Sequence, residues 1–467
     1  MVTILDLPDE CLTNICKRLD DDFLRYCWVN VCKRFQYIYY GYFHNWTEVN
    51  DYLAQNFGHQ IGTNDFPMKI VKRINLSKLK CSKKFLNKLR LAHPEVEEAK
   101  LFSFTDEYMA ELLPLPNLKV LICIGTYDLR GRSLIDLCGL TELHIHTNKS
   151  IDAENVLQAT YYNPLRVLVI PNDPGVFAER YAFEMVDNLK YLEKLVVEYN
   201  HCKSWQLIGT LPRLKKLEIW DFVTHGCAFC WTNPDSYQTC APNHDKIFFN
   251  ELCKKDQLEE LIFCDGCLTE FHLTGISQLK SLRILKFSRA AFIDEVSLDV
   301  FADLVNFEEL HIDNGKRILA YQSLEFFRNC QKLKRVNFWY AGGINGNFIS
   351  KANDILGKRK PPPREPVTFG FQFLNANYLR ATIEGLYIST PVFYIRITHL
   401  QRKFVAAEES YLETEEEAVS QSPLQGELLK RKFSIMNIVP VETEIKMEFV
   451  GQVEKRQDPE GRSEGEE

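Results

Sequence analysis

The chain has 467 residues, of which 45% are hydrophobic and 25% charged, proportions typical of a globular protein with two to four domains. Its formal net charge is −7, and residues 406–467 carry sixteen Asp/Glu against seven Lys/Arg. Residues 1–405 hold 49 basic and 47 acidic residues. This balance disfavours a nucleic-acid-binding protein, because binding to a phosphate backbone needs an excess of Lys and Arg.

The sequence also indicates a compartment. No apolar run approaches the roughly 20 residues that a membrane span needs, and the N-terminus lacks the basic and apolar regions of a secretory signal. There are fifteen cysteines, and Cys123, Cys138 and Cys330 lie within apolar periodic segments, as small hydrophobes do in a reducing compartment. We therefore expect a cytoplasmic and/or nuclear protein that has no membrane partner.

Residues 1–45 have helical periodicity. Leu12, Ile15 and Leu19 recur at steps of three and four, which places them on one helix face, and Pro8 suits a helix start. A second apolar stripe with the same spacing runs from Leu24 to Phe35. A unit of this size cannot bury a core of its own, so it is expected to pack against another surface.

These residues resemble an F-box. The strings that carry the resemblance are Leu7-Pro8-x-Glu10-x-Leu12-x-x-Ile15-x-x-x-Leu19 and Val29-Asn-Val31-Cys-Lys-Arg-Phe35. The acidic run 20–22 departs from the family pattern, in which one Asp is usual, and this affects contact assignments beyond Leu19. The resemblance implies a receptor that binds a Skp-family adaptor, and through it the cullin and RING subunits of an SCF-type ubiquitin ligase. The implied contacts are Leu7, Pro8, Glu10, Leu12, Ile15 and Leu19, with Trp28, Val31 and Phe35 either contacts or internal core.

The alternative is a helix pair whose only role is to cap a repeat array in the next part of the chain. Residues 46–66 are expected to be a linker between these helices and that array.

A hexad, apolar-x-x-apolar-x-apolar, recurs through the middle of the chain. Its eleven copies begin 22 to 27 residues apart, apart from one interval of 44. They span residues 71–76, 96–101, 118–123, 140–145, 165–170, 192–197, 214–219, 258–263, 282–287, 307–312 and 333–338. A repeat of 20–29 residues with this pattern is typical of one short strand and one return segment, stacked into a solenoid.

The fixed apolar positions are expected to point inward, and the x positions to lie exposed on one curved parallel sheet. Helical spacing predicts outer helices at Lys83–Leu91, Asp106–Leu113 and Ala153–Ala159. The pattern resembles the intracellular leucine-rich-repeat family, an α/β solenoid, here over residues 67–345 with an insertion at 222–250.

The x positions of the hexads carry twelve Lys/Arg and nine Asp/Glu. A mixed surface suits a protein partner better than a phosphate backbone, which needs one sign of charge. Solvated positions with no binding role are the simpler alternative. The candidate substrate-binding residues are Lys194, Lys216, Trp220, Glu260, Lys286, Glu309, Arg335 and Trp339. For the aromatic members Trp220 and Trp339, packing at the edge of the sheet is the preferred alternative.

The 44-residue interval contains Cys227, Cys230, Cys240 and His244, which could supply four zinc ligands. A second possible set is Cys227, Cys230, Cys264 and Cys267. The spacing matches no known zinc module, so a degenerate repeat with incidental cysteines is preferred, and no cofactor is expected. A zinc-containing nucleic-acid binder is a third, disfavoured class of function.

No phosphate-binding loop, metalloprotease, serine-hydrolase or dinucleotide motif is present, so the chain is not expected to be an enzyme. The repeat phase is expected to end after Phe338. Residues 346–405 are expected to form a terminal cap region, in which a stiff basic connector at 358–363 precedes strand-like residues at 366–400. The acidic residues 406–467 are expected to be disordered. The favoured function is a substrate receptor of an SCF-type ligase, and the alternative is a protein-interaction scaffold or inhibitor outside any ligase.

Overall fold

The computed structural model of the chain describes residues 4–19, 28, 31–32, 34–35, 38–39, 47–63, 66, 68, 70–113, 115–126, 129–147, 151–172, 175–178, 180–199, 203–222, 242–339, 346–371, 395–404 and 438–443. None of the helices in these residues is long and apolar enough to cross a membrane.

Fifteen strands in the described residues form one sheet, in which each strand pairs with the next along the chain. Strands β1 to β14 run parallel, and β15 is antiparallel to β14. They are β1 (Glu48–Asn50), β2 (Arg73–Ser77), β3 (Glu98–Phe102), β4 (Val120–Thr126), β5 (Glu142–Thr147), β6 (Val167–Ile170), β7 (Lys194–Glu198), β8 (Lys216–Phe222), β9 (Glu260–Leu268), β10 (Ile284–Phe292), β11 (Glu309–Ile312), β12 (Arg335–Phe338), β13 (Val367–Phe371), β14 (Ile395–Phe404) and β15 (Ile438–Thr443).

The eleven predicted hexads are confirmed as strands β2 to β12, and they stack in register. Leu121 lies opposite Leu143, and Leu143 lies opposite Leu168, so the fourth hexad position forms one continuous column. These leucines are fully buried. A slip of one residue would turn the column toward solvent, so burial of this face fixes the register. The fold is therefore a leucine-rich-repeat solenoid.

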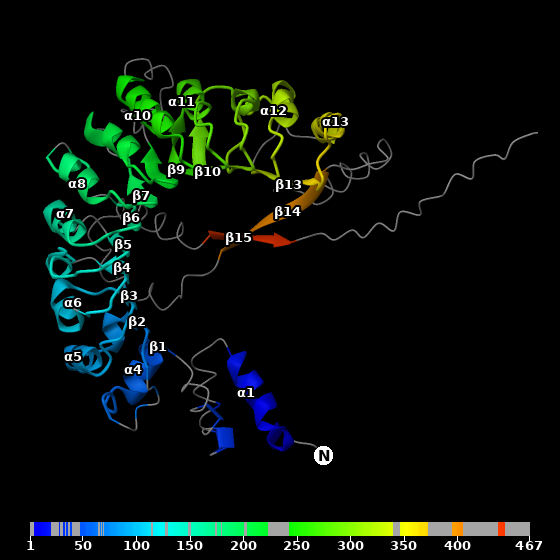
Figure 1. Ribbon diagram of the computed structural model, residues 1–467. Coiled ribbons are helices and arrows are strands. Elements are labelled where there is room, and N and C mark those ends of the chain that lie inside the picture. The colour runs from blue at the N-terminus through cyan, green and yellow to red at the C-terminus, as the bar shows by residue number, and fades with distance from the viewer. Residues whose placement is uncertain are drawn as a thin grey trace, which may run out of the picture.

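The sheet lines the inner, concave side of an arc, and the helices cover its outer side (Figure 1). The predicted helices are confirmed as α5 (Lys83–Ala92), α6 (Asp106–Leu112) and α7 (Ala153–Tyr161). The other helices are α1 (Asp9–Lys17), α4 (Asp51–Phe57), α8 (Ala182–Asn188), α10 (Pro242–Lys255), α11 (Glu270–Ile276), α12 (Leu324–Asn329) and α13 (Gly346–Gly357). Short 3-10 helices lie at η1 (Ile4–Asp6), η2 (Lys78–Lys80), η3 (Arg132–Leu134), η4 (Lys203–Thr210), η6 (Leu298–Phe301) and η7 (Ala320–Gln322).

Aspartates at the starts of α4 and α6 each join their repeat to the next one. The Asp51 carboxylate accepts a hydrogen bond from the backbone N–H of Ser77 at 2.7 Å. Asp106 does the same for Arg130 at 2.7 Å. Because an unpaired buried N–H is costly, these contacts satisfy the backbone where one coil passes to the next.

The predicted linker at 46–66 needs correction, because part of it belongs to the solenoid. Val49 in β1 lies opposite Ile74 in β2, and Val49 is fully buried. Helix α4 follows directly, with the Asn50 side chain accepting a hydrogen bond from the Leu53 N–H at its start. This short strand adds one more coil before the first hexad.

The repeat phase also continues beyond its predicted end. Phe369 in β13 lies opposite Val336 in β12, so the parallel register persists past residue 345. The basic connector at 358–363 packs against the solenoid at Arg359, which is only 5% exposed. Its Nε donates a hydrogen bond to the Phe327 carbonyl at 2.7 Å. Within the predicted disordered segment 406–467, the structure describes residues 438–443 as β15.

The 44-residue interval is one repeat with an insertion rather than two repeats. Leu217 in β8 lies directly opposite Leu261 in β9, so no strand separates them. The interpretation as a degenerate repeat is therefore wrong. Residues 223–241 of the insertion lie outside the described residues, and α10 leads from there into β9.

Candidate protein-binding surfaces

The N-terminal motif begins at α1, whose N-cap is Pro8 with extended backbone (φ −57°, ψ 153°). Leu12 is fully buried, while Ile15 and Leu19 are half-buried and pack against the same core. Leu7 is also half-buried, whereas Pro8 and Glu10 are exposed. The apolar face of α1 thus packs mainly within the chain.

The second half of the motif contributes an aromatic stack. The rings of Trp28 and Phe35 lie 4.1 Å apart and nearly parallel, and their exposed fractions are 7% and 2%. Arg34 forms an ion pair with Asp9 at 2.6 Å and donates to the Leu7 carbonyl at 2.6 Å, which ties both halves together.

One expected adaptor contact therefore needs correction: Leu12 belongs to the internal core, because its side chain is covered by the chain itself. For Trp28 and Phe35, which were expected to be either contacts or internal core, burial favours the internal core. Val31 is 59% exposed and, with Pro8 and Glu10, forms the accessible part of the motif in the described residues.

Four rows of side chains cross the strands from repeat to repeat. The edge row is the second hexad position, just before each strand. The lower, middle and upper rows of the concave face are the third position, the fifth position and the residue directly after the hexad. Neighbouring members of a row lie opposite each other, as Lys194, Lys216 and Glu260 do in the lower row.

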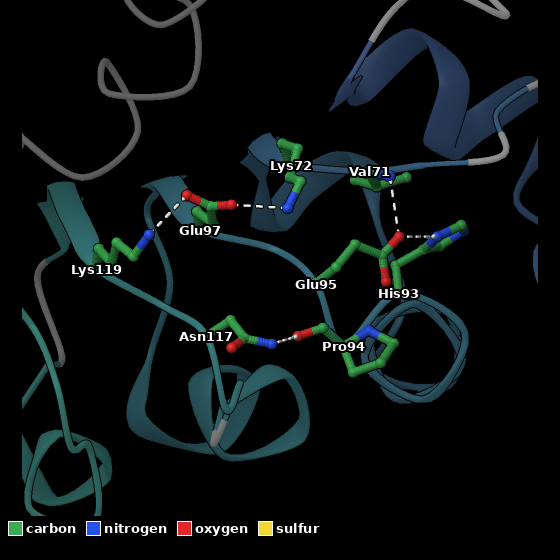
Figure 2. A network of polar contacts seen from close by, with 8 residues as sticks. All are labelled: Val71, Lys72, His93, Pro94, Glu95, Glu97, Asn117 and Lys119. Carbon is green, nitrogen blue, oxygen red and sulfur yellow. Dashed lines mark hydrogen bonds and ion pairs between the residues drawn. The ribbon is translucent and has the colours of Figure 1, made fainter.

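The edge row forms a ladder of ion pairs. Glu97 lies between Lys72 at 2.7 Å and Lys119 at 3.0 Å (Figure 2). Hydrogen bonds from Lys72 and then Lys119, with their charges, lower the pKa of Glu97 to about 2. Just below the ladder, Glu95 accepts a hydrogen bond from the Val71 N–H at 3.1 Å and meets His93 at 3.2 Å.

The same alternation continues in later repeats. Arg166 pairs with Glu193 at 3.0 Å. Arg283 bridges Glu259 at 3.2 Å and Glu308 at 2.9 Å. Many charged side chains at the x positions therefore form ion pairs with side chains of the neighbouring coil. At exposed positions such pairs contribute little to stability.

Three predicted substrate-binding residues meet on the concave face of β8 to β10. Glu260 accepts from Lys216 at 2.8 Å and from Lys286 at 3.0 Å, and its side chain is 17% exposed. Burial opposes ionisation, but hydrogen bonds from both lysines hold the pKa of Glu260 below its usual value. This cluster offers both signs of charge within three repeats.

Trp220 lies at the upper row beside this cluster. Its indole N–H donates to the Glu218 carboxylate at 2.9 Å, and the Cys264 thiol lies 3.6 Å from the same oxygen. Burial raises the pKa of the Cys264 thiol, and the charge of Glu218 raises it further. Cys264 is thus an uncharged packing residue at neutral pH.

The predicted residues of β11 and β12 divide into two groups. Glu309 contacts His311 at 3.1 Å, and His311 contacts Asn337 at 2.9 Å, so these form a half-buried polar network next to Arg335. The His311 hydrogen bond lowers the pKa of Glu309. Trp339 is only 5% exposed, which favours packing at the rim of the sheet, the stated alternative, over an exposed anchor.

Three of the four candidate zinc ligands, Cys227, Cys230 and Cys240, lie outside the described residues. His244 lies in α10, and Cys264 and Cys267 are buried in β9. Among the described residues, no group of three or more His, Cys, Asp or Glu could hold a metal ion.

Two features of the concave face were not predicted. One is a column of residues in the left-handed backbone region, directly after the upper row; its members are Ser103, Gly125, Asp221, Asp265 and Arg289. Their common offset from the hexad start could have revealed the column. The other is that Lys100 on β3 and His144 and His146 on β5 share the concave face with the predicted Lys194 on β7, where hexad position also gives the signal.

Comparisons with known proteins give fold-level similarity only. No family model matches the chain, and no curated protein matches it. Similar solved structures include the Rad7–Elc1 complex in yeast, with 13% identity, a TM-score of 0.38 and coverage of 78% of this chain and 88% of that chain. They also include an internalin (inlF) from Listeria monocytogenes, with 13% identity, a TM-score of 0.32 and coverage of 67% and 99%. The TLR13–ssRNA13 complex is similar with 13% identity, a TM-score of 0.38 and coverage of 72% and 49%.

Proposed function

We propose that the chain is a substrate receptor of an SCF-type ubiquitin ligase. In this proposal the N-terminal helices bind a Skp-family adaptor, and the concave face of the solenoid binds a target protein for ubiquitylation. The observation that carries the proposal is an F-box-like motif that joins the repeat core. Leu12 and Cys16 of α1 belong to the same continuous buried cluster as the solenoid leucines. A rigid connection of this kind would hold a target at a fixed distance from the adaptor.

The accessible part of the motif supports an adaptor contact. Pro8 and Glu10 lie on the first turn of α1, and Val31 presents an aliphatic side chain that is 59% exposed. Apolar anchors buried at the centre of an interface dominate its binding energy.

The proposed binding surface for the target protein is the concave face of the sheet. The rows of β7 to β12 present Lys194, the Glu260 cluster and the Glu309–His311 network on one surface. Such a surface of both charge signs favours a protein target over a nucleic acid.

A second candidate function is a protein-interaction scaffold outside any ligase. The burial of Leu12, Trp28 and Phe35 in the chain's own core favours it, because a helix pair that only caps the solenoid would bury the same side chains. Binding of the adaptor separates the two functions.

The test is co-purification of the full chain with a purified Skp-family adaptor. We expect the Leu7→Ala/Pro8→Ala variant to lose the adaptor, since truncating one aliphatic anchor costs about 2 kcal/mol or more of binding free energy. Val31→Asp should act in the same direction while changing only an exposed side chain. Leu91→Ala, at a leucine that is 70% exposed on α5, is the matched control.

The circular dichroism of all variants should equal that of the wild type. Unchanged co-purification with both motif variants, or no binding by the wild type, would remove the ligase function and leave the scaffold.

A further inference from the structure

A surface pocket lies at the edge of the sheet, where strands β5 to β8 begin. Its volume is about 230 Å³, and it is lined by Thr141, Pro164, Arg166, Tyr191, Glu193 and Arg213. Each of these residues stands just before one of the four strands, in the edge row or in the turn that leads to it. The pocket is therefore separate from the lower, middle and upper rows of the concave face.

A buried asparagine shapes this edge. The Asn163 side-chain oxygen accepts a hydrogen bond from the Leu140 N–H at 2.7 Å, and its amide nitrogen donates to two backbone carbonyls at 2.9 and 2.6 Å. These bonds fix the turn after α7. The residues on either side of Asn163, Tyr162 and Pro164, are both exposed.

Tyr191 and Arg213 come from neighbouring coils and meet at the pocket. The Arg213 guanidinium lies over the Tyr191 ring, 5.2 Å from its centre. With the other residues that the structure describes, Arg213 forms neither an ion pair nor a hydrogen bond. Stacking on a ring holds a guanidinium in one orientation, while its N–H groups can still bind a carboxylate in a bidentate way.

The second arginine of the pocket already has a carboxylate partner. Nε and Nη2 of Arg166 donate to the two carboxylate oxygens of Glu193, at 3.1 and 3.0 Å. The hydrogen bond from Arg166 is the main cause that holds the pKa of Glu193 below its usual value. Glu193 is therefore ionised and bound to Arg166, and it leaves the charge of Arg213 without a contact.

The other charged groups of this edge nearly balance. They are Lys190 and Lys215 against Glu142 and Asp187. Lys194 follows Glu193 in the chain, but its charge acts on His144 and His146 of the concave face. One positive charge thus remains at the pocket, and it belongs to Arg213.

We propose that this pocket, the Tyr191–Arg213 pocket, binds a protein partner that inserts one large apolar side chain and places a carboxylate beside it on Arg213. The apolar side chain packs against the Tyr191 ring and Pro164, and the carboxylate accepts hydrogen bonds from the guanidinium. This contact goes beyond the proposed function, because a ligase receptor and a scaffold could both use it.

The size and composition of the pocket favour a protein partner. Sites for free small molecules usually enclose roughly 300–1,000 Å³, so a pocket of about 230 Å³ is better suited to one side chain. Tyrosine and arginine supply much of the binding energy of protein interfaces. Two more exposed tyrosines, Tyr161 and Tyr162, extend the same edge.

A single-stranded nucleic acid fits this edge less well. Bases need open aromatic faces, but the Tyr191 ring has both Arg213 and Lys190 over it. A phosphate backbone needs a clear excess of cations, and here the carboxylates of Glu142 and Glu193 would repel it.

The experiment pans a phage-displayed library of random twelve-residue peptides on the full chain at pH 7. Phage that also bind the Tyr191→Ala/Arg213→Gln double variant are removed, so that the remaining peptides depend on the pocket. These peptides should share one large apolar residue with an Asp or Glu within two residues of it. For a synthesised peptide, Arg213→Gln should raise Kd about tenfold, the loss expected for one charge-assisted contact.

Arg180→Gln is the matched control. The Arg180 guanidinium also lies over a tyrosine, 5.0 Å from the centre of the Tyr181 ring, but neither residue lines the pocket. This variant should bind the peptide with unchanged Kd. Circular dichroism should be the same for all variants, since each changes an exposed side chain.

A double-mutant cycle separates direct contact from a structural role of Arg213. Replacing the acidic residue of the peptide by its amide should raise Kd about tenfold for the wild type and should have little further effect on Arg213→Gln. If Arg213 only supported the shape of the edge, the two losses would add.

The inference is overturned if the two losses add, if the selected peptides lack an acidic residue, or if Arg180→Gln weakens binding as much as Arg213→Gln. Tighter binding of a twelve-residue oligothymidylate, lost in Arg213→Gln, would also overturn it, in favour of a nucleic acid. If no phage remain after the double variant has been used, the inference falls. None of these results affects adaptor co-purification, which decides the ligase function by itself.

Discussion

Lys194 and Lys216 occupy the same hexad position in neighbouring repeats, yet only Lys216 has an ion-pair partner among the described residues. The difference is the residue on the following strand, since Glu260 lies opposite Lys216, whereas Val167 and Lys216 lie on either side of Lys194. A pair of charges already in contact loses part of its attraction to any new partner. A lysine of the concave face is thus available for binding where the neighbouring strands place no carboxylate opposite it.

His146 should make the stability of the protein depend on pH. Its pKa is about 4 in the folded chain and about 6.5 when unfolded, because burial, His144, Lys194 and Lys100 disfavour the imidazolium. Below pH 6.5 the unfolded chain takes up a proton that the folded chain refuses, so the free energy of unfolding falls as pH drops toward 4 and is regained above 6.5. The contribution is at most about 3 kcal/mol.

Urea midpoints at pH 7.5, 6.0 and 4.5 measure this effect. The difference between wild type and His146→Gln should shrink as pH falls, while His59→Gln, at an exposed histidine, should follow the wild type at every pH. A difference that stays constant with pH would contradict the assignment.

At the scale of elements, the strands were predictable where a buried face imposes a pattern. All eleven hexads became strands because their apolar positions must point inward in every coil. β1 escaped prediction, since Glu48-Val49-Asn50 offers one apolar residue and no period. Lys100 and Lys194 could be placed on strands from the sequence, but that neither forms an ion pair among the described residues depends on which side chains meet across strands.

The upper edge of the sheet shows how one residue can hold two strands together. Gly266 in β9 has φ +146°, and a Cβ there would lie 2.5 Å from the backbone oxygen of Phe222 in β8. Only glycine allows this approach, next to the left-handed residues Asp221 and Asp265.

Gly266→Ala should therefore lower the free energy of unfolding by about 3 kcal/mol, because backbone strain adds to the clash with β8. Gly139→Ala is the matched control: its φ is +88°, but a Cβ there meets nothing within 4 Å. It should cost about 1 kcal/mol from backbone strain alone. Urea unfolding measures both, and equal losses would show that the approach of β8 and β9 is unimportant.

At the scale of the whole molecule, each coil of the solenoid contacts mainly its neighbours, so stability is a sum over coils and interfaces. A run of phenylalanines links the coils of the C-terminal half. Phe263 stacks on Phe287 at 5.8 Å, and Phe327 stacks on Phe369 at 5.3 Å, where β13 pairs with β12. A lesion near this end should be felt nearby and not at the other end of the arc (Figure 1).

Phe369→Ala tests this view of the molecule. The fully buried ring leaves a cavity against Phe327, and such a truncation costs about 3–5 kcal/mol. Because the cost falls on the last coils, backbone hydrogen exchange should rise in β12 and β13 and stay unchanged in β2 to β5. Phe183→Ala, at a phenylalanine that is 69% exposed on α8, should change neither region. A rise of equal size along the whole sheet would mean that the solenoid unfolds as one cooperative unit, so that a target bound to the concave face would stabilise every coil rather than those it contacts.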